Sequence, residues 1–294
     1  IAGHHGFYEQ LALEELGQKI TLPARPAPPT PAEMDAVKNN PGFQRAVHAI
    51  RLGIRQEGVK EWNYTAGLVD AQGKRGRMTD REKQAAAQWA CEMEIWDRCI
   101  SSTERTSQYD VNHRFPMPFK EEVLSRTRDI NLEAAYVYGL IRQESRFVIN
   151  ARSSVGASGL MQVMPRTAKW TAKKIGLKNF QPDQLNQRDT NIAIGTGYLK
   201  LVLDNFHGSM PMAAAAYNAG PSRPRKWRNG PLLEGAIWTE CIPFTETRDY
   251  VKKVLSNTTA YAALITGEPQ SLKARLGKIG PREKSEPEDD NELP

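Results

Sequence analysis

The chain has 294 residues, of which 39% are hydrophobic and 25% charged, with a net charge of +6 at pH 7. This composition is typical of a globular protein, and no apolar run approaches the roughly 18 to 20 residues of a membrane-spanning helix. The positive charge is compatible with a polyanionic partner, but the lysines and arginines are scattered and no nucleic-acid-binding motif is present.

The first third of the chain predicts helices joined by short connectors. Residues 6–16 form an amphipathic pattern that Gly17 can close, because glycine is favoured after helix ends. Residues 23–31 contain five prolines and predict a stiff, extended connector. Residues 43–56 predict one helix, since Phe43, Val47, Ile50 and Ile54 recur at helical spacing.

Residues 70–78 are polar and contain glycine, which is typical of a loop. Thr79 is followed three positions later by Glu82, and this spacing predicts a capping box at the start of a helix. A further helix is expected over residues 96–103. The succession of helix pairs suggests a helical array, although no exact repeat period is visible.

The three cysteines, Cys91, Cys99 and Cys241, contain no CxxC pair and therefore do not predict a zinc site. On one straight helix the Cα atoms of Cys91 and Cys99 would lie about 12 Å apart, which is too far for a disulfide. If the chain turns between them, a disulfide becomes possible. Both alternatives, a disulfide and two buried thiols, remain open from the sequence.

Two prolines within residues 110–119 interrupt the helical pattern and place a domain boundary there. We therefore expect a helical portion at 1–112, a second domain at 113–268 and a polar, disordered tail at 269–294. Within the second domain, Asp189 and Asn191 lie at the beginning of an apolar-periodic stretch. We interpret them as helix-capping residues.

Several common catalytic patterns are absent from the sequence. The five histidines are scattered without an HExxH motif, and there is no GxSxG turn, P-loop or GxGxxG motif. Metal-dependent, serine-hydrolase and nucleotide-dependent functions therefore lose their usual support, and no cofactor is predicted.

One acidic residue continues an apolar helix face. Leu132, Tyr136, Leu140 and Glu144 recur every four residues, so a carboxyl group at the end of this stripe would be partly desolvated. Desolvation and the negative end of the helix dipole both raise the pKa of a carboxyl group, as a general acid requires. The alternative is an exposed glutamate, or one paired with Arg142 or Arg146.

The segment that follows, residues 152–165, is a turn rich in small residues that ends at Pro165. Gly156 and Gly159 would permit a ligand to approach the backbone closely, and Pro165 can begin the next helix. Met161, Gln162 and Met164 would then lie beside a cleft.

Four motifs occur in order: Glu144-Ser145, GASGLMQVMP at 156–165, AAYNAGP at 215–221 and IPFTETRDYV at 242–251. Together they closely resemble the catalytic domain of the soluble lytic murein transglycosylases. The resemblance is sharp over about residues 131–265 and weaker upstream, where residues 1–110 look like the last part of that family's superhelical and linker domains. Each motif alone is a weak signal, whereas four in register are strong.

The resemblance implies a mainly α fold: a goose-type lysozyme-like domain with a small antiparallel sheet, preceded by α-superhelical helix pairs. The segment GLMQVM would be a strand of that sheet. It also implies that Glu144 is the sole catalytic acid and base, with Ser145 as its structural neighbour. The other positions that match the family's substrate-side residues are Ser153, Met161, Gln162, Met164, Tyr217, Asn218, Glu246 and Tyr250.

Structural roles remain open for three of these positions. Tyr217 and Tyr250 could be helix-packing aromatics, and Glu246 could be an acidic residue that favours a helix N-terminus. For the whole chain, the resemblance implies cleavage of the β-1,4 bond between N-acetylmuramic acid and N-acetylglucosamine, with a 1,6-anhydromuramoyl product. A lysozyme-type hydrolase and a non-catalytic wall-binding scaffold are the alternatives.

The expected partner is the peptidoglycan glycan strand, and neither nucleic acid nor a membrane span is expected. The family also favours a monomer in the periplasm and leaves room for contacts with other cell-wall enzymes. Because the chain begins at Ile1 without a visible signal peptide, we expect a mature or truncated product.

Overall fold

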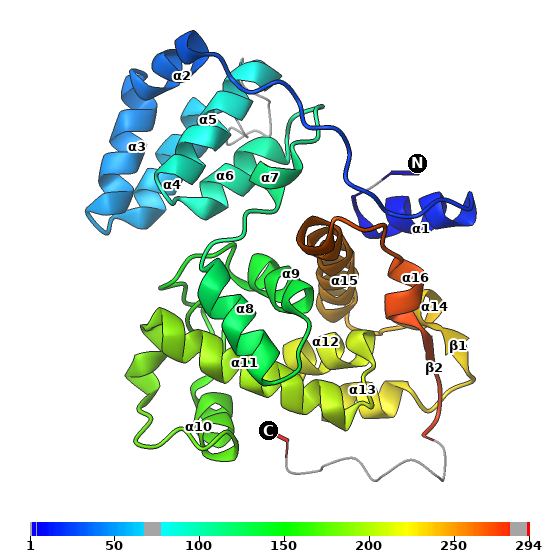
Figure 1. Cartoon of the computed structure of the whole chain (residues 1–294). Helices are drawn as coiled ribbons and strands as arrows, with labels where there is room; N and C mark the ends of the chain where they lie inside the picture. Colours follow the sequence, from blue (N-terminus) through cyan, green and yellow to red (C-terminus); the bar gives the residue numbers. More distant parts are fainter. Residues whose placement is uncertain (1, 4, 68–77, 283–292) are drawn as a thin grey trace. The chain divides into compact units, whose positions relative to one another are not determined.

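The computed structural model describes residues 2–3, 5–67, 78–282 and 293–294. The chain forms two compact units, one of Ile1–Leu22 with Met117–Pro294 and the other of Pro23–Pro116. The predicted mainly α fold with a small antiparallel sheet is confirmed (Figure 1). The sheet pairs β1 (Leu233–Glu234) with β2 (Lys278–Ile279). Among the described helices, none is long and apolar enough to cross a membrane.

The unit of residues 23–116 is built from pairs of helices. Its elements are α2 (Pro31–Lys38), α3 (Pro41–Arg51), α4 (Arg55–Thr65), α5 (Asp80–Glu92), α6 (Trp96–Thr103) and α7 (Val111–Arg114). Three aromatic rings lie at the centre of its core. The ring centroid of Trp62 lies 4.6 Å from that of Phe43 and 6.0 Å from that of Trp89. The indole N–H of Trp62 donates to Ser102 Oγ at 3.0 Å, so its polar atom is satisfied inside the core.

The ends of these helices follow local sequence signals, with one exception. The capping box of Thr79 and Glu82 is confirmed at the start of α5. The single helix predicted over residues 43–56 is wrong, because α3 ends at Arg51 and α4 begins at Arg55. Gly53 lies between them at a φ of +82°, a left-handed conformation that breaks the helix. The loop predicted at 70–78 lies outside the described residues except for its last position.

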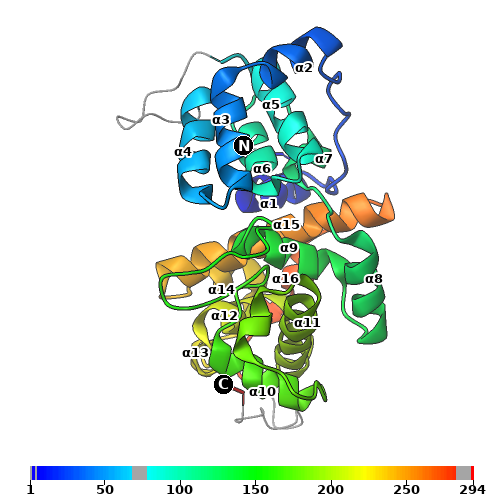
Figure 2. The ribbon, with the colours of Figure 1, turned by 90° about the vertical axis from the view of Figure 1, so that its left-hand side faces the viewer.

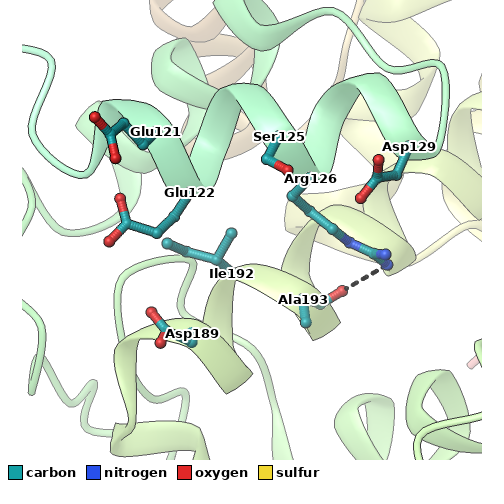
Figure 3. Close-up of a pocket in the computed structure, with 8 residues that line it drawn as sticks. All are labelled: Glu121, Glu122, Ser125, Arg126, Asp129, Asp189, Ile192 and Ala193. Carbon is teal, nitrogen blue, oxygen red and sulfur yellow. Dashed lines mark hydrogen bonds between the residues drawn. The ribbon is translucent and has the colours of Figure 1, made fainter.

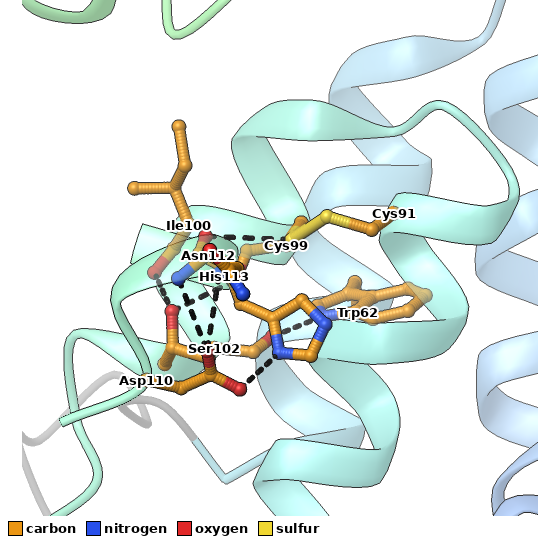
Figure 4. The surroundings of a disulfide bond; sticks show 9 residues. Trp62, Cys91, Cys99, Ile100, Ser102, Asp110, Asn112 and His113 are labelled. Carbon is orange, nitrogen blue, oxygen red and sulfur yellow. Dashed lines mark hydrogen bonds and ion pairs between the residues drawn. A yellow bond between two sulfur atoms is a disulfide. The ribbon is translucent and has the colours of Figure 1, made fainter. Parts of the chain in front are cut away.

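The two cysteines of this unit form a disulfide (Figure 4). The helix α5 ends at Glu92 and α6 begins at Trp96, so the chain reverses direction between the cysteines. This turn brings the Cα atoms of Cys91 and Cys99 to 5.2 Å, within disulfide range. The structure therefore selects the disulfide from the two alternatives that spacing left open. Cys241, in the other unit, is a free, exposed thiol.

The other unit is centred on two helices that pack side by side, α9 (Ala134–Glu144) and α15 (Thr245–Thr266) (Figure 2). Gly139 allows this close approach, because a Cβ atom there would lie 2.5 Å from Thr258 Oγ1 and 3.0 Å from the Val254 carbonyl oxygen. Around this pair lie α1 (Phe7–Glu15), α8 (Lys120–Asp129), α10 (Pro165–Lys174), the 3₁₀ helix at Pro182–Asn186, α11 (Arg188–Asn205), α12 (Met210–Ala219), α13 (Ser222–Trp227), α14 (Gly235–Glu240) and α16 (Leu272–Leu276).

The chain divides at different points from those expected at residues 112 and 269. Residues 1–22 join the unit of residues 117–294, because α1 packs against α15 and α16 and Ile20 exchanges two backbone hydrogen bonds with Gln270. The described part of the expected disordered tail is ordered as far as residue 282. Leu272, Leu276 and Ile279 are buried and anchor it, while residues 283–292 lie outside the described residues.

Candidate active site

The last residue of α9 is Glu144, at the end of a helix whose residues 135–142 are all buried. Burial raises the pKa of its carboxyl group, a hydrogen bond from Tyr250 lowers it, and the negative charge of Glu246 raises it further, to about 7. The apolar stripe through Tyr136 and Leu140 therefore leads to a carboxyl group with a raised pKa, as the helical spacing predicted. Such a group is protonated in about half of the molecules near neutral pH.

Tyr250, from α15, is a hydrogen-bond partner of this carboxyl group. Its hydroxyl donates to Glu144 Oε1 at 2.5 Å. Burial and the negative charge of Glu144 raise the pKa of Tyr250 well above its usual value, so the hydroxyl keeps its proton and remains a donor. The contact joins two helices that are more than 100 positions apart in the sequence.

Tyr217 reaches the same place from α12. Its hydroxyl donates to the Met161 carbonyl oxygen at 2.8 Å, and its ring centroid lies 5.4 Å from that of Tyr198. Burial raises the pKa of Tyr217, and the negative charge of Glu144 raises it further. Tyr217 is therefore a protonated donor that fixes the backbone of the segment after α9 close to the carboxyl group.

The segment at residues 151–164 is a compact loop, which we call the 151–164 loop. The strand predicted for GLMQVM is wrong: Ser158 forms isolated bridges with Arg152 and Val163, and no continuous ladder follows. Gly159 has a φ of +80° and Gln162 a φ of +46°. Two left-handed residues so close together turn the chain and prevent extended pairing.

Asn191 of α11 forms hydrogen bonds to the backbone of this loop, and its side chain is buried, with 1% exposure. Its Nδ2 donates to the carbonyl oxygens of Ser158 at 3.0 Å and Leu185 at 2.8 Å, and its Oδ1 accepts from the Met161 N–H at 2.8 Å. The predicted capping role is wrong, because α11 begins at Arg188 and Gln187 is its N-cap. The available signal was a polar amide among the apolar residues of that helix.

Ser145 and Gln162 make further hydrogen bonds within the same region. Ser145 Oγ donates to the Leu160 carbonyl oxygen at 2.7 Å, so the end of α9 is fastened to the loop. Gln162 Nε2 donates to the carbonyl oxygens of Ala151 at 3.0 Å and Gly159 at 2.7 Å. The bonds from Gln162 add a second donor to carbonyl oxygens that already accept backbone hydrogen bonds, and so reinforce the turn.

The remaining loop positions expected beside the substrate lie in different surroundings. Met161 is fully buried, and a Cβ atom at Gly195 would lie 2.4 Å from its sulfur, so its side chain fills the core against α11. Ser153 Oγ accepts from the Ala157 N–H at 2.9 Å. Met164 is 40% exposed, and it offers an apolar surface to solvent beside the loop.

Asn218 and Glu246 extend the site towards the start of α15. Asn218 Oδ1 accepts from Thr247 Oγ1 at 2.7 Å, and Asn218 Nδ2 donates to Glu246 Oε1 at 3.5 Å. Glu246 is exposed, and its charge acts on the Glu144 carboxyl group. The structure thus brings residues from α9, α12, α15 and the 151–164 loop to one place.

This arrangement can hold a proton near neutral pH and exchange it with a bound molecule. The Glu144 side chain is partly buried, and two protonated tyrosines lie next to it. Within the described ranges, no group of three His, Cys, Asp or Glu side chains is positioned to hold a metal ion. The chemistry to which this geometry is suited is proton transfer by a single carboxyl group.

A separate pocket lies between α8 and α11, with a volume of about 480 Å³ (Figure 3). Four carboxylates border it, and Arg126 crosses it to donate to the Ala193 carbonyl oxygen at 3.4 Å. Its lining residues are Glu121, Glu122, Ser125, Arg126, Asp129, Asp189, Ile192 and Ala193. None of these is a predicted substrate-side residue, so this pocket is distinct from the cluster around Glu144.

Comparison with family models identifies two segments of the chain. Residues 123–231 match the model described as the transglycosylase SLT domain. Residues 241–270 match the model described as the soluble lytic transglycosylase helical domain. This second match covers α15 and not the residues 1–112 for which a superhelical portion was expected.

Comparison with curated proteins and solved structures agrees with these matches. The soluble lytic murein transglycosylase of Salmonella typhimurium is 34% identical over 271 residues, which cover 91% of this chain and 40% of the relative. The structure of an inactive mutant of the Pseudomonas aeruginosa lytic transglycosylase Slt superposes with a TM-score of 0.81 at 33% identity, covering 94% of this chain and 44% of that one.

The 70 kDa soluble lytic transglycosylase of Escherichia coli gives a TM-score of 0.76 at 28% identity, covering 95% of this chain and 44% of that one. This chain therefore spans about two fifths of the length of the curated relatives that it matches.

Proposed function

Because this chain belongs to the soluble lytic murein transglycosylase family, we propose that it cleaves the glycan strands of peptidoglycan. The bond cleaved is the β-1,4 linkage between N-acetylmuramic acid and N-acetylglucosamine, and Glu144 is the acid and base. The observation that carries the proposal is the partly buried Glu144 carboxyl group, with a pKa of about 7 and the Tyr250 hydroxyl donor 2.5 Å away.

A single carboxyl group changes how the cleavage must proceed. Most glycosidases use two carboxyl groups, one as acid and the other as nucleophile or base. Among the described residues, Glu246 is a second carboxylate whose charge acts on Glu144, but it is exposed to water and bonded to Asn218. The second chemical group is therefore supplied by the substrate, through the N-acetyl group of the muramoyl sugar.

In the first step, protonated Glu144 gives its proton to the glycosidic oxygen. The bond from that oxygen to the anomeric carbon breaks, and N-acetylglucosamine leaves with a new hydroxyl group. The carbonyl oxygen of the muramoyl N-acetyl group bonds to the anomeric carbon and forms an oxazolinium ring. The hydroxyl of Tyr250 stabilises the Glu144 carboxylate that this step creates, because it donates to the charged form.

In the second step, the Glu144 carboxylate takes the proton from the C6 hydroxyl of the same muramoyl sugar. The C6 oxygen attacks the anomeric carbon while the bond to the N-acetyl oxygen breaks, and a 1,6-anhydro ring closes. Glu144 is protonated again and no water is consumed. Met164 and the hydroxyl of Tyr217 would lie on the substrate side, and Ser153 and Gln162 would keep the 151–164 loop in shape.

The proposed function also implies a binding partner and a location for the chain. Its partner is the glycan strand, which the net charge of +6 would help to attract to an anionic wall. A periplasmic location and a monomeric state follow from the proposed substrate and family. Contacts with other cell-wall enzymes remain a prediction.

The test is mass spectrometry of the fragments released from purified sacculi by this chain and by Glu144→Gln. We expect 1,6-anhydromuramoyl ends from the parent chain and none from the variant, with equal thermal melting of both at pH 4. Reducing ends would instead identify a lysozyme-type hydrolase on the same fold. Fragments released equally by both proteins would remove Glu144 from the mechanism, and binding without release by either would favour a wall-binding scaffold.

A further inference from the structure

Beyond the residues already described, an exposed aromatic group lies next to the start of α15. Phe244, the N-cap of that helix, is 46% exposed. Its ring centroid lies 5.4 Å from that of Trp227, edge to face, and the guanidinium of Arg223 lies 4.9 Å above it. We call Arg223, Trp227 and Phe244 the aromatic platform.

Contacts of neighbouring residues fix the position of the platform. Arg223 and Trp227 are four residues apart on α13 and therefore share one face of that helix. Arg225, two residues after Arg223, points to the other side and donates to Asn205 Oδ1 at 2.9 Å. Trp238, which is 3% exposed, donates its indole N–H to the Trp227 carbonyl oxygen at 3.3 Å. The rings thus need little reordering to meet a ligand.

Short contacts connect the platform to the residues around Glu144. Arg223 donates to the Ala219 carbonyl oxygen, and the neighbouring Asn218 bonds to Glu246 and Thr247 at the start of α15. Phe244 precedes Tyr250 by six residues, which corresponds to a rise of about 9 Å along the helix. A short oligosaccharide can span the distance from the Tyr250–Glu144 contact to these rings.

The chemistry of the platform suits a carbohydrate. The face of a pyranose ring carries C–H groups with a small positive charge, which are attracted to the electron-rich face of an aromatic ring. The guanidinium of Arg223, which lies over the Phe244 ring, adds N–H donors for sugar hydroxyls beside the exposed aromatic surface. An apolar protein partner would have little use for this charged, hydrogen-bonding group.

We propose that the aromatic platform is a further glycan subsite, which holds a sugar ring of the strand away from the bond being cleaved. This inference rests on the proposed function, because it assumes a peptidoglycan glycan as ligand. It adds a specific binding surface that positions a long strand so that the reactive linkage stays beside Glu144.

The experiment measures the affinity of Glu144→Gln, which leaves the ligand intact, for a soluble oligosaccharide of alternating N-acetylglucosamine and N-acetylmuramic acid by titration calorimetry. Adding Phe244→Leu or Trp227→Leu should weaken binding by about fivefold to tenfold. Phe244→Tyr, which keeps the ring, should bind like the Glu144→Gln parent. Leu232→Ala removes an apolar side chain that is 66% exposed and should also leave the affinity unchanged.

Equal affinity of Phe244→Leu, Trp227→Leu and the parent would overturn the platform. Equal weakening by Phe244→Tyr and Phe244→Leu would also overturn it, because a ring would then not be the recognised feature. A parent that binds no oligosaccharide would do the same. Cleavage of sacculi by the unaltered chain tests the proposed function separately, so the two failures are distinguishable.

Discussion

The hydroxyl of Tyr250 donates a 2.5 Å hydrogen bond to Oε1 of Glu144, and this contact joins α15 to the last residue of α9. It acts against burial, because a donor to the charged carboxylate lowers the pKa that desolvation raises. The balance leaves the pKa of Glu144 at about 7, and at that pKa one carboxyl group can both give and accept a proton near neutral pH.

Replacing Tyr250 by Phe removes the contribution that lowers the pKa of Glu144, so that pKa should rise further. The first step needs protonated Glu144, and its rate falls as pH rises through that pKa. We therefore expect the alkaline limb of the pH–rate profile to move to higher pH in Tyr250→Phe, alongside a lower maximal rate. Tyr64→Phe, at an exposed position of the other unit, should leave the profile in place. An unmoved alkaline limb in Tyr250→Phe would contradict this account.

Glu144 should also make folding stability depend on pH. Its pKa is about 7 in the folded chain against 4.5 for an ordinary glutamate, so between these values the folded state binds the proton that the unfolded state has released. The free energy of unfolding therefore falls as pH rises from about 4.5 to 7, by up to about 3 kcal/mol. Glu144→Gln should melt like the parent at pH 4 and at a higher temperature at pH 8. An unchanged difference between these two pH values would exclude the raised pKa.

Asn191→Leu should loosen the 151–164 loop. The substitution removes three hydrogen bonds from buried backbone groups, so the free energy of unfolding should fall by about 2–4 kcal/mol. Urea denaturation measures this loss, and hydrogen exchange at Met161 should become faster. Asp189→Ala, at an exposed position on the same turn of α11, is the control and should change stability by less than about 0.5 kcal/mol.

Gly139→Ala should disturb the contact between α9 and α15. The added methyl group would lie 2.9 Å from the Thr258 nitrogen and 3.0 Å from the Val254 carbonyl oxygen, and backbone atoms cannot move aside cheaply. We expect a loss of about 1–3 kcal/mol and reduced activity, because the Tyr250–Glu144 bond spans these helices. Gly230→Ala, where a Cβ atom meets nothing within 4 Å, should preserve both stability and activity.

Reducing the Cys91–Cys99 disulfide should destabilise the unit of residues 23–116. A short loop closed by a disulfide contributes about 2–3 kcal/mol through the lost entropy of the unfolded chain. Cys91→Ser with Cys99→Ser should lower the melting temperature of that unit, and a reducing agent should then have no further effect. Cys241→Ser, which removes an exposed thiol, should melt like the parent. Equal melting of the double variant and the parent would show that the disulfide adds nothing.

The parts of this protein that sequence determined are those governed by local spacing. The capping box at Thr79 and the end of α9 at Glu144 follow from hydrogen bonds and apolar periodicity within a few residues. The raised pKa of Glu144 followed as well, because a carboxyl group on an apolar stripe is desolvated wherever the stripe packs. The four motifs placed Tyr217 and Tyr250 among the candidate residues before any contact was known.

Tertiary structure decided what depends on distant partners. The turn between α5 and α6 selected the disulfide, and the left-handed Gly159 and Gln162 replaced an expected strand by a loop. Asn191 could be assigned to the loop only once α11 packed beneath it. Residues 270–282 are ordered because their apolar side chains find a surface built from α1 and α15. Such contacts join positions far apart in the chain, and local periodicity carries no information about which of them will meet.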